Sequence, residues 1–248
     1  MRGAAHSHRT VDRVAGILEA AAVQPDGVRL AEVADRLDAP RSSIHSLLKG
    51  LVAVGYLVER EGSYVIGPGL SALLAPRQER SIVDVARADV ADLSERVEET
   101  VLLGTRVGES IVYVYQVECR HSIRYSAQLG QRRPLYPPSI GKLFLSDMDQ
   151  RRLDAFLRHH REFDPDAVRA ELAEIRETGV AYNREETVKG VMAAAAAIRK
   201  ADGRVVAAIS ATGPAYRMTD RLTKIGEEVL QTAGRISKAV SANPRLWA

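Results

Sequence analysis

Two short helical patterns followed by two short strand patterns, all in the first third of the chain, constrain its fold most. The helical patterns cover 28–37 and 40–51, and the strand patterns cover 56–58 and 64–66. Pro40 suits the first position of a helix, where its missing N–H costs no hydrogen bond. Two helices joined by a tight turn and followed by a β-hairpin form a winged helix-turn-helix, and this is the fold that the pattern predicts.

The second of these helices has one apolar face and one polar face. The apolar stripe falls at i, i+3, i+4 and i+7 and consists of Ile44, Leu47, Leu48 and Leu51. The opposite face carries Ser42, His45, Ser46 and Lys49. Hydroxyl, imidazole and ammonium groups on a short helix can read the major groove of DNA. The same pattern also fits an ordinary amphipathic surface helix, so this helix alone leaves both interpretations open.

If this unit binds DNA, the placement of its charges matters more than their number. The whole chain has 35 basic and 32 acidic residues, and residues 1–77 contain nine of the basic and eight of the acidic ones. The expected contacts from the helix are Arg41, Ser42, His45, Ser46 and Lys49. The expected phosphate contacts outside it are Arg9, Arg13 and the hairpin residue Arg60.

The composition is that of a globular protein with room for two domains. The chain has 248 residues, of which 46% are hydrophobic and 27% are charged. No apolar run approaches the roughly 18 residues of a membrane span, and the first nine residues lack the apolar core of a signal peptide. We therefore expect a cytoplasmic protein without membrane contact. The single cysteine, Cys119, excludes an internal disulfide and a multi-cysteine zinc site.

Strands, helices and a further strand hairpin alternate in the rest of the chain. A first helix is expected over 10–22, and Ser81 can cap a helix that ends near Glu98. The other expected helices are 140 onward, 149–159, 165–178 and 219–240, and the expected strands are 101–107, 110–117, 122–126, 191–199 and 204–212. This order predicts an α+β second domain around a mostly antiparallel sheet.

The sequence gives little support for a catalytic site, a metal site or a nucleotide-binding loop. Gly141-Lys142 lacks the upstream glycine and the following Ser or Thr of a phosphate-binding loop. His159 and His160 are adjacent, so they diverge on a helix and cannot chelate one metal ion together. Carboxylates near Asn183 are more typical of a solvated turn than of acid–base chemistry. We expect no enzyme activity, no metal and no cofactor.

One segment has the chemistry of an anion site. The amides of Ser139, Ile140 and Gly141 are expected to be free donors at a helix start. Ser210 and Thr212 alternate along a strand, so both hydroxyls lie on one face of it. That face can equally point to solvent, and the sequence leaves this open.

The chain resembles the IclR family of bacterial transcriptional regulators over nearly its whole length. The matching positions in the first part are Arg13, Ile17-Leu18, 30–37, 40–48, Leu51, 55–57 and 64–67. Those in the second part are 140–142, Leu145, 175–181, Glu185-Glu186, Gly190-Val191 and 203–214. No single motif is very specific, but their order and spacing are.

The resemblance implies a winged helix-turn-helix domain over 1–76, a linker helix over 77–98 and a GAF-like effector-binding domain over 99–248. Family members pair through their DNA-binding domains and often form tetramers, and their effectors are typically small organic acids. Carried over by position, the effector pocket comprises Ser139, Ile140, Asn183, Ala193, Ser210 and Thr212.

The chain departs from the family pattern at three places. Ser46 stands where an arginine usually follows the recognition-helix histidine, which removes one DNA contact. Asn183 replaces an acidic residue near the pocket, so one negative charge facing the effector is absent. Ala193 and Ala197 replace the usual Cys and Pro, which predicts a wider and less polar wall.

We therefore expect a homodimer, or a tetramer built from it, that binds a pseudo-palindromic DNA operator and responds to a small carboxylate. An aromatic acid such as a hydroxybenzoate is favoured, with Arg133 as a cationic partner and Tyr125, Tyr136 and Met192 as apolar surface. Three alternatives remain: a short keto acid as effector, a C-terminal domain that only oligomerises, and an enzyme on a GAF-like domain.

Overall fold

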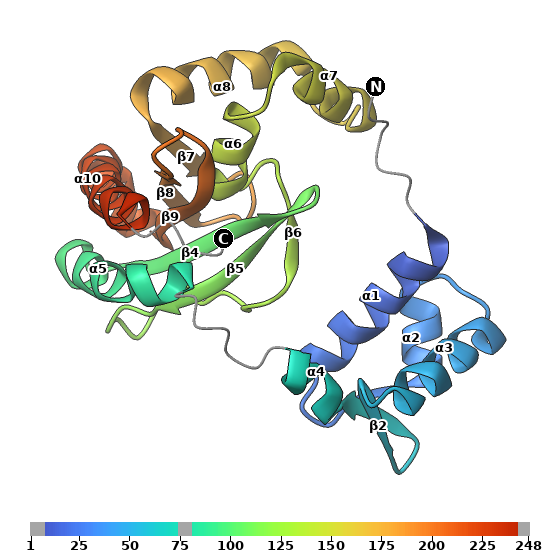
Figure 1. Ribbon diagram of the computed structural model, residues 1–248. Coiled ribbons are helices and arrows are strands. Elements are labelled where there is room, and N and C mark those ends of the chain that lie inside the picture. The colour runs from blue at the N-terminus through green and yellow to red at the C-terminus, as the bar shows by residue number, and fades with distance from the viewer. Residues whose placement is uncertain (1–7, 74–80, 243–248) are drawn as a thin grey trace. The chain divides into compact units, whose positions relative to one another are not determined.

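The computed structural model describes residues 8–73 and 81–242 and divides the chain into two compact units, Met1–Gln78 and Glu79–Ala248. Figure 1 shows the two units, each of which has its own core. They are described separately below.

The first unit is a winged helix-turn-helix, as the sequence predicts. Its elements are α1 (Arg9–Val23), β1 (Val28–Arg29), α2 (Leu30–Arg36), α3 (Arg41–Ala53), β2 (Leu57–Arg60), β3 (Ser63–Ile66) and α4 (Pro68–Leu73). The strands form one antiparallel sheet in the order β1-β3-β2. The apolar stripe of α3 packs inward, and Ile44 and Leu48 are completely buried against Ile17 of α1 and its neighbours.

Residues with positive φ form the hairpin turn of this unit and the cap of its helix α3. The β2–β3 hairpin turns at Glu61 and Gly62, both with positive φ, which is the two-residue turn that matches strand twist. Helix α3 ends at Ala53, and Gly55 just beyond it has a φ of 77° and donates its N–H to the carbonyl of Val52, while Tyr56 donates to that of Leu51. This pair of bonds is a Schellman cap, and it confirms Gly55 as the capping residue of the helix.

The sequence prediction differs from this unit in two places. Val28 and Arg29 form strand β1 rather than the start of a helix, because Val28 pairs with Tyr64 and is buried. The chain also continues past Gly67 into the short helix α4, where we expected the unit to end.

The second unit is an antiparallel six-stranded sheet with helices on both faces. Its strands are β4 (Thr100–Val107), β5 (Ser110–Val117), β6 (Arg132–Pro134), β7 (Val180–Arg184), β8 (Val191–Arg199) and β9 (Val205–Pro214), in the order β6-β5-β4-β9-β8-β7. Its helices are α5 (Ile82–Val97), α6 (Ser139–Ser146), α7 (Gln150–His159), α8 (Pro165–Thr178), α9 (Ala215–Met218), a 3-10 turn (Thr219–Arg221) and α10 (Leu222–Ser241).

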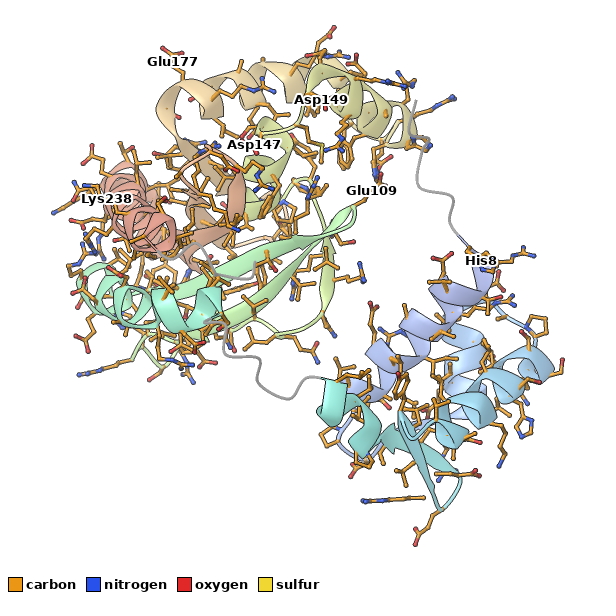
Figure 2. All side chains as sticks on the ribbon, viewed as in Figure 1. His8, Glu109, Asp147, Asp149, Glu177 and Lys238 are labelled. Carbon is orange, nitrogen blue, oxygen red and sulfur yellow. The ribbon has the colours of Figure 1, made fainter. Side chains whose placement is uncertain are left out.

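Alternation along the strands separates two cores. On β8, Ala194 and Ala196 face α5 and α10, which pack side by side on one face of the sheet (Figure 1). Ala195 faces the layer of α6, α7 and α8 on the other face. Charged groups such as Glu177 on α8 and Lys238 on α10 point outward in Figure 2. The expected α+β fold around an antiparallel sheet is therefore confirmed.

The caps that the sequence predicts are present in this unit. Ser81 accepts a hydrogen bond from the amide of Asp84 at the start of α5, and Asp164 caps α8 with Pro165 as its first residue. Helix α5, which we expected to be a linker helix, packs on α10 within the second unit.

Two predictions for this unit were wrong, and the edge strands β6 and β7 were not predicted. Residues 122–126 are not a strand: the side chain of Thr100 donates to the carbonyl of Tyr125, and just after the segment the amide of Ala127 donates to the side chain of Gln116. The strand beside β5 is β6 instead, and β7 forms the opposite edge of the sheet. Helix α10 begins at Leu222 rather than Thr219, since α9 and the 3-10 turn occupy the preceding residues. Within the described residues, no helix is long and apolar enough to span a membrane.

Candidate functional site

The outer face of α3 carries the side chains that the sequence assigns to DNA. Arg41, Ser42, His45, Ser46 and Lys49 are all exposed, whereas the opposite face is buried. The fold thus presents one polar helix face to solvent in the way that a groove-reading helix requires.

Several of these groups already have partners. The ammonium of Lys49 lies 2.8 Å from Oε2 of Glu59 on β2, and this hydrogen bond raises the pKa of Lys49. The hydroxyl of Ser46 donates to the carbonyl of Ser42 one turn earlier. Arg13 donates to the hydroxyl of Ser43 and so joins α1 to α3. The carboxylate of Glu59 therefore competes with a DNA phosphate for the ammonium of Lys49.

Three other basic side chains expected to contact DNA are available for a polyanion. Arg9, Arg41 and Arg60 are exposed and form no side-chain hydrogen bond or ion pair within residues 8–73. Arg60 is the last residue of β2, at the turn of the hairpin, and Arg41 is the first of α3. Hairpin and helix thus each offer an unpaired guanidinium.

The second unit contains a small cavity of about 30 Å³ on the α6 side of its sheet. Asn183, Ala193 and Thr212 are cross-strand neighbours on β7, β8 and β9 and form one wall of it. The complete lining is Tyr113, Tyr125, Arg133, Pro138, Ser139, Asn183, Thr187, Val188, Val191, Ala193 and Thr212.

The cavity contains six of the ten residues that we expected around an effector, namely Tyr125, Arg133, Ser139, Asn183, Ala193 and Thr212. The sequence reading missed Tyr113, Pro138, Thr187, Val188 and Val191. Strand alternation on β5 would have identified Tyr113, which shares its face with buried Ile111. Thr187 and Val188 lie in a loop and carry no comparable signal.

The other four expected residues do not line the cavity. Ser210 lies behind its wall, with its hydroxyl 3.2 Å from that of Thr212 and 3.5 Å from that of Ser139. The side chain of Ile140 is buried in the core, and the hydroxyl of Tyr136 donates to Glu171 on α8.

Met192 requires a correction, because it lies on the opposite face of the sheet. It packs against the α5–α10 core, and its sulfur lies 3.7 Å from the hydroxyl of Thr219. Since successive strand residues face opposite sides, Met192 and Ala193 cannot both line one pocket. Ala197 is likewise absent from the lining, so it does not widen this cavity.

The charge of the cavity is positive. Arg133 is the one charged residue in its lining, and its Nε is buried without a hydrogen-bond partner among the described residues. Its guanidinium lies 5.2 Å from the centre of the Tyr113 ring. Burial raises the pKa of Tyr113 to about 12, so its phenol remains neutral at physiological pH. Arg133 as a whole is half-buried, but a buried N–H without an acceptor is costly, and an anion would satisfy it.

Helix α6 adds further donors at the same place. Ser139, its first residue, lines the cavity, and no side chain caps the helix. The N–H groups of a first helical turn favour anions, by hydrogen bonding and by the helix dipole. Together with Arg133 and the hydroxyls of Thr187 and Thr212, the arrangement suits a small carboxylate. No group of three or more metal-ligating side chains occurs in the described residues.

Comparison with known protein families gives two matches. The family described as the IclR helix-turn-helix domain matches residues 10–61, and the family described as bacterial transcriptional regulator IclR C-terminal matches residues 77–238.

Curated relatives match over most of their length. The HTH-type transcriptional regulator BhcR of Paracoccus denitrificans is 33% identical over 242 residues, which cover 92% of this chain and 86% of the relative. The HTH-type transcriptional repressor AllR of Escherichia coli K12 is 32% identical over 223 residues, covering 85% and 82%.

Solved structures share the fold. An IclR homologue from Microbacterium hydrocarbonoxydans, crystallised in complex with 4-hydroxybenzoate, matches with a TM-score of 0.75 at 21% identity, covering 94% of this chain and 99% of that one. A regulator from Silicibacter sp. TM1040 matches with a TM-score of 0.78 at 23% identity, covering 96% and 100%.

Proposed function

This chain belongs to the IclR family of bacterial transcriptional regulators, and we propose that it responds to a small carboxylate bound in the cavity beside Arg133. Family membership makes it a DNA-binding regulator with an effector domain rather than an enzyme. The proposal concerns the chemistry of the effector and the residues that bind it.

The buried Nε of Arg133 carries this proposal. It has no hydrogen-bond partner among the described residues, and no Asp or Glu belongs to the cavity that Arg133 lines. A carboxylate would accept from this guanidinium and from the first amides of α6 at once. Asn183, which stands where the family has an acidic residue, adds no negative charge that would oppose such a ligand.

The volume of the cavity supports a short acid over an aromatic one. A cavity of about 150 Å³ is known to hold a benzene ring, and the volume here is about 30 Å³. An acid of two or three carbons, such as a short keto acid, requires much smaller adjustments of the lining than a hydroxybenzoate does. This reverses the order of the two effector classes that the sequence suggested.

An aromatic carboxylate is the second candidate. A homologue of the same fold was crystallised with 4-hydroxybenzoate, and Tyr113 and Tyr125 offer ring surfaces in this cavity. Such a ligand would require Val188, which is 44% exposed at the edge of the cavity, to move outward.

Titration calorimetry of the full-length protein with pyruvate and with 4-hydroxybenzoate tests the proposal. We expect pyruvate to bind more tightly, and Arg133→Met to weaken binding roughly tenfold or more, since a hydrogen bond to a charged group is lost. Arg132→Met is the matched control, because it removes the same charge from a neighbouring β6 residue outside the cavity. Equal effects of both variants, or no binding of either acid, would instead favour a domain that only oligomerises.

We further propose that the chain acts as a symmetric dimer, which can pair again into a tetramer, on a pseudo-palindromic operator. Two copies of α3 would then read two half-sites, with Arg9, Arg41 and Arg60 available for phosphates. Footprinting should give two protected regions related by inverted symmetry. A single unrepeated footprint, or a monomer by sedimentation at micromolar concentration, would contradict this.

A further inference from the structure

A fully buried lysine lies next to the effector cavity. Lys142 on α6 has no exposed surface, and its ammonium donates to Oε1 of Glu171 and Oε2 of Glu186, both at 2.5 Å, and to the carbonyl of Tyr182 at 2.9 Å. An ammonium has three N–H donors, so all of them are used. Lys142 therefore joins three separate segments of the chain.

One of these segments forms part of the cavity. Glu186 belongs to the β7–β8 loop, residues 185–190, and the next two residues of this loop, Thr187 and Val188, line the cavity. At the other end of the link, Ser139 lines the cavity one turn before Lys142 on α6. The Lys142–Glu186 ion pair thus connects two walls of the cavity without lining it.

The remaining bonds of the loop mostly hold it to itself and to its own strands, and they include the amide of Gly190 donating to the carboxylate of Glu185. The side chain of Asn183 donates to Thr187, and Val191 donates to the carbonyl of Val188. Lys142–Glu186 is the one ion pair of this loop among the described residues. It is also the bond that ties the loop to the helical layer on this face of the sheet.

The two carboxylates around Lys142 are closely matched. Glu171 and Glu186 are 28% and 32% exposed, and each lies 2.5 Å from the same nitrogen. Each also has a second donor: Tyr136 donates to Glu171, and the amide of Arg184 donates to Glu186. Burial and the Glu171 carboxylate raise the pKa of Tyr136, so its phenol stays a donor. Of the two, however, only Glu186 lies in the loop whose residues Thr187 and Val188 line the cavity.

We propose that Lys142 is a positioning residue for effector recognition, which holds Thr187 and Val188 against the cavity through Glu186. Without this bond the partly exposed Glu186 turns to water, and the loop moves away from Ser139 and Arg133. The anchoring of the loop then sets how large an effector can be and how tightly it is held. The part of this proposal that concerns the effector rests on the proposed function.

Glu186→Gln and Glu171→Gln form a matched pair for the test, since each removes one carboxylate from the same ammonium. The readouts are hydrogen exchange of peptides covering 184–192 in the ligand-free protein, and titration with pyruvate. For Glu186→Gln we expect exchange in this segment to rise roughly tenfold, because a buried ion-pair anchor is lost, and pyruvate binding to weaken by a similar factor. For Glu171→Gln both should stay within about twofold of wild type.

Equal exchange of the loop in the two variants, or faster exchange in Glu171→Gln alone, would overturn the proposal and leave Lys142 a general core contact. If Glu186→Gln does not fold, Glu186→Asp takes its place, because it keeps the charge but shortens the reach to Lys142. The exchange measurement needs no ligand. Failure of pyruvate to bind the wild type would therefore count against the proposed function, while the exchange data would still decide the role of Lys142.

Discussion

The ion pair between Lys49 on α3 and Glu59 on β2 allows a direct test of whether Lys49 contacts a DNA phosphate. The two side chains are 53% and 37% exposed, so their pairing contributes little to folding. Glu59→Gln should leave the fold intact and free Lys49 for a phosphate. We therefore expect this variant to bind operator DNA more tightly than the wild type at low salt.

The size of the effect follows from counter-ion release. Each additional phosphate contact steepens the dependence of log K on log salt by about 0.9. A rise from about 50 to about 200 mM salt then reduces the advantage of the variant roughly 3.5-fold for one new contact, and roughly 12-fold for the two contacts of a dimer. Both effects must have the same origin, because a freed ammonium that contacts a phosphate strengthens DNA binding and also makes binding more sensitive to salt.

Fluorescence anisotropy with a labelled operator duplex over this salt range measures both quantities. Glu61→Gln is the control, since it makes the same charge change at the tip of the hairpin without touching Lys49. Lys49→Ala together with Glu59→Gln should abolish the gain. If Glu61→Gln tightens binding and steepens the salt dependence as much as Glu59→Gln, only net charge matters, and the assignment of Lys49 to the phosphate contacts is refuted.

Three further outcomes are expected. Ile44→Ala should destabilise the first unit by about 2–5 kcal/mol in urea unfolding, because it empties a fully buried site; a loss below about 1 kcal/mol would contradict the packing of α3. Glu99→Gln should destabilise the second unit by roughly 3 kcal/mol, since it leaves Arg217 without its two-bond partner; an unchanged Tm would refute this. Tyr113, whose pKa rises from 10.0 to about 12, should stabilise the fold below pH 10 and lose that contribution as pH rises towards 12; absorbance at alkaline pH should show late-titrating tyrosines, since the pKa values of Tyr136 and Tyr182 are also raised, and Tyr113→Phe should remove one of them.

Local patterns predicted much of this fold because short-range interactions determine them. The stripe through Ile44 and Leu48 follows the helical repeat, and it places the face of Ser42 and His45 in solvent wherever α3 packs. Asp164 caps α8 for the same reason, since a cap needs only the amides that follow it. The wrong assignment of Met192 was also avoidable, because alternation along β8 already separates it from Ala193.

The edge strands were harder to predict because their partners are distant or polar. Strand β7 ends in Asn183 and Arg184 and is stabilised by pairing with β8 rather than by its own composition. The segment with Tyr125 has a strand-like sequence, yet side chains of Thr100 and Gln116 satisfy its backbone. No local sequence pattern indicates that side chains, rather than a neighbouring strand, will bond to the backbone of a segment.

The sequence by itself determined the two kinds of unit, the exposed face of α3 and the strand that carries Thr212, because periodicity and caps act over a few residues. The tertiary structure alone decided that Lys142 is buried between Glu171 and Glu186, that the buried Nε of Arg133 has no hydrogen-bond partner among the described residues, and that the cavity is small. The two carboxylates that bond to Lys142 are 29 and 44 residues away from it in the sequence. Burial and pairing of this kind depend on where distant segments come together, which no short pattern encodes.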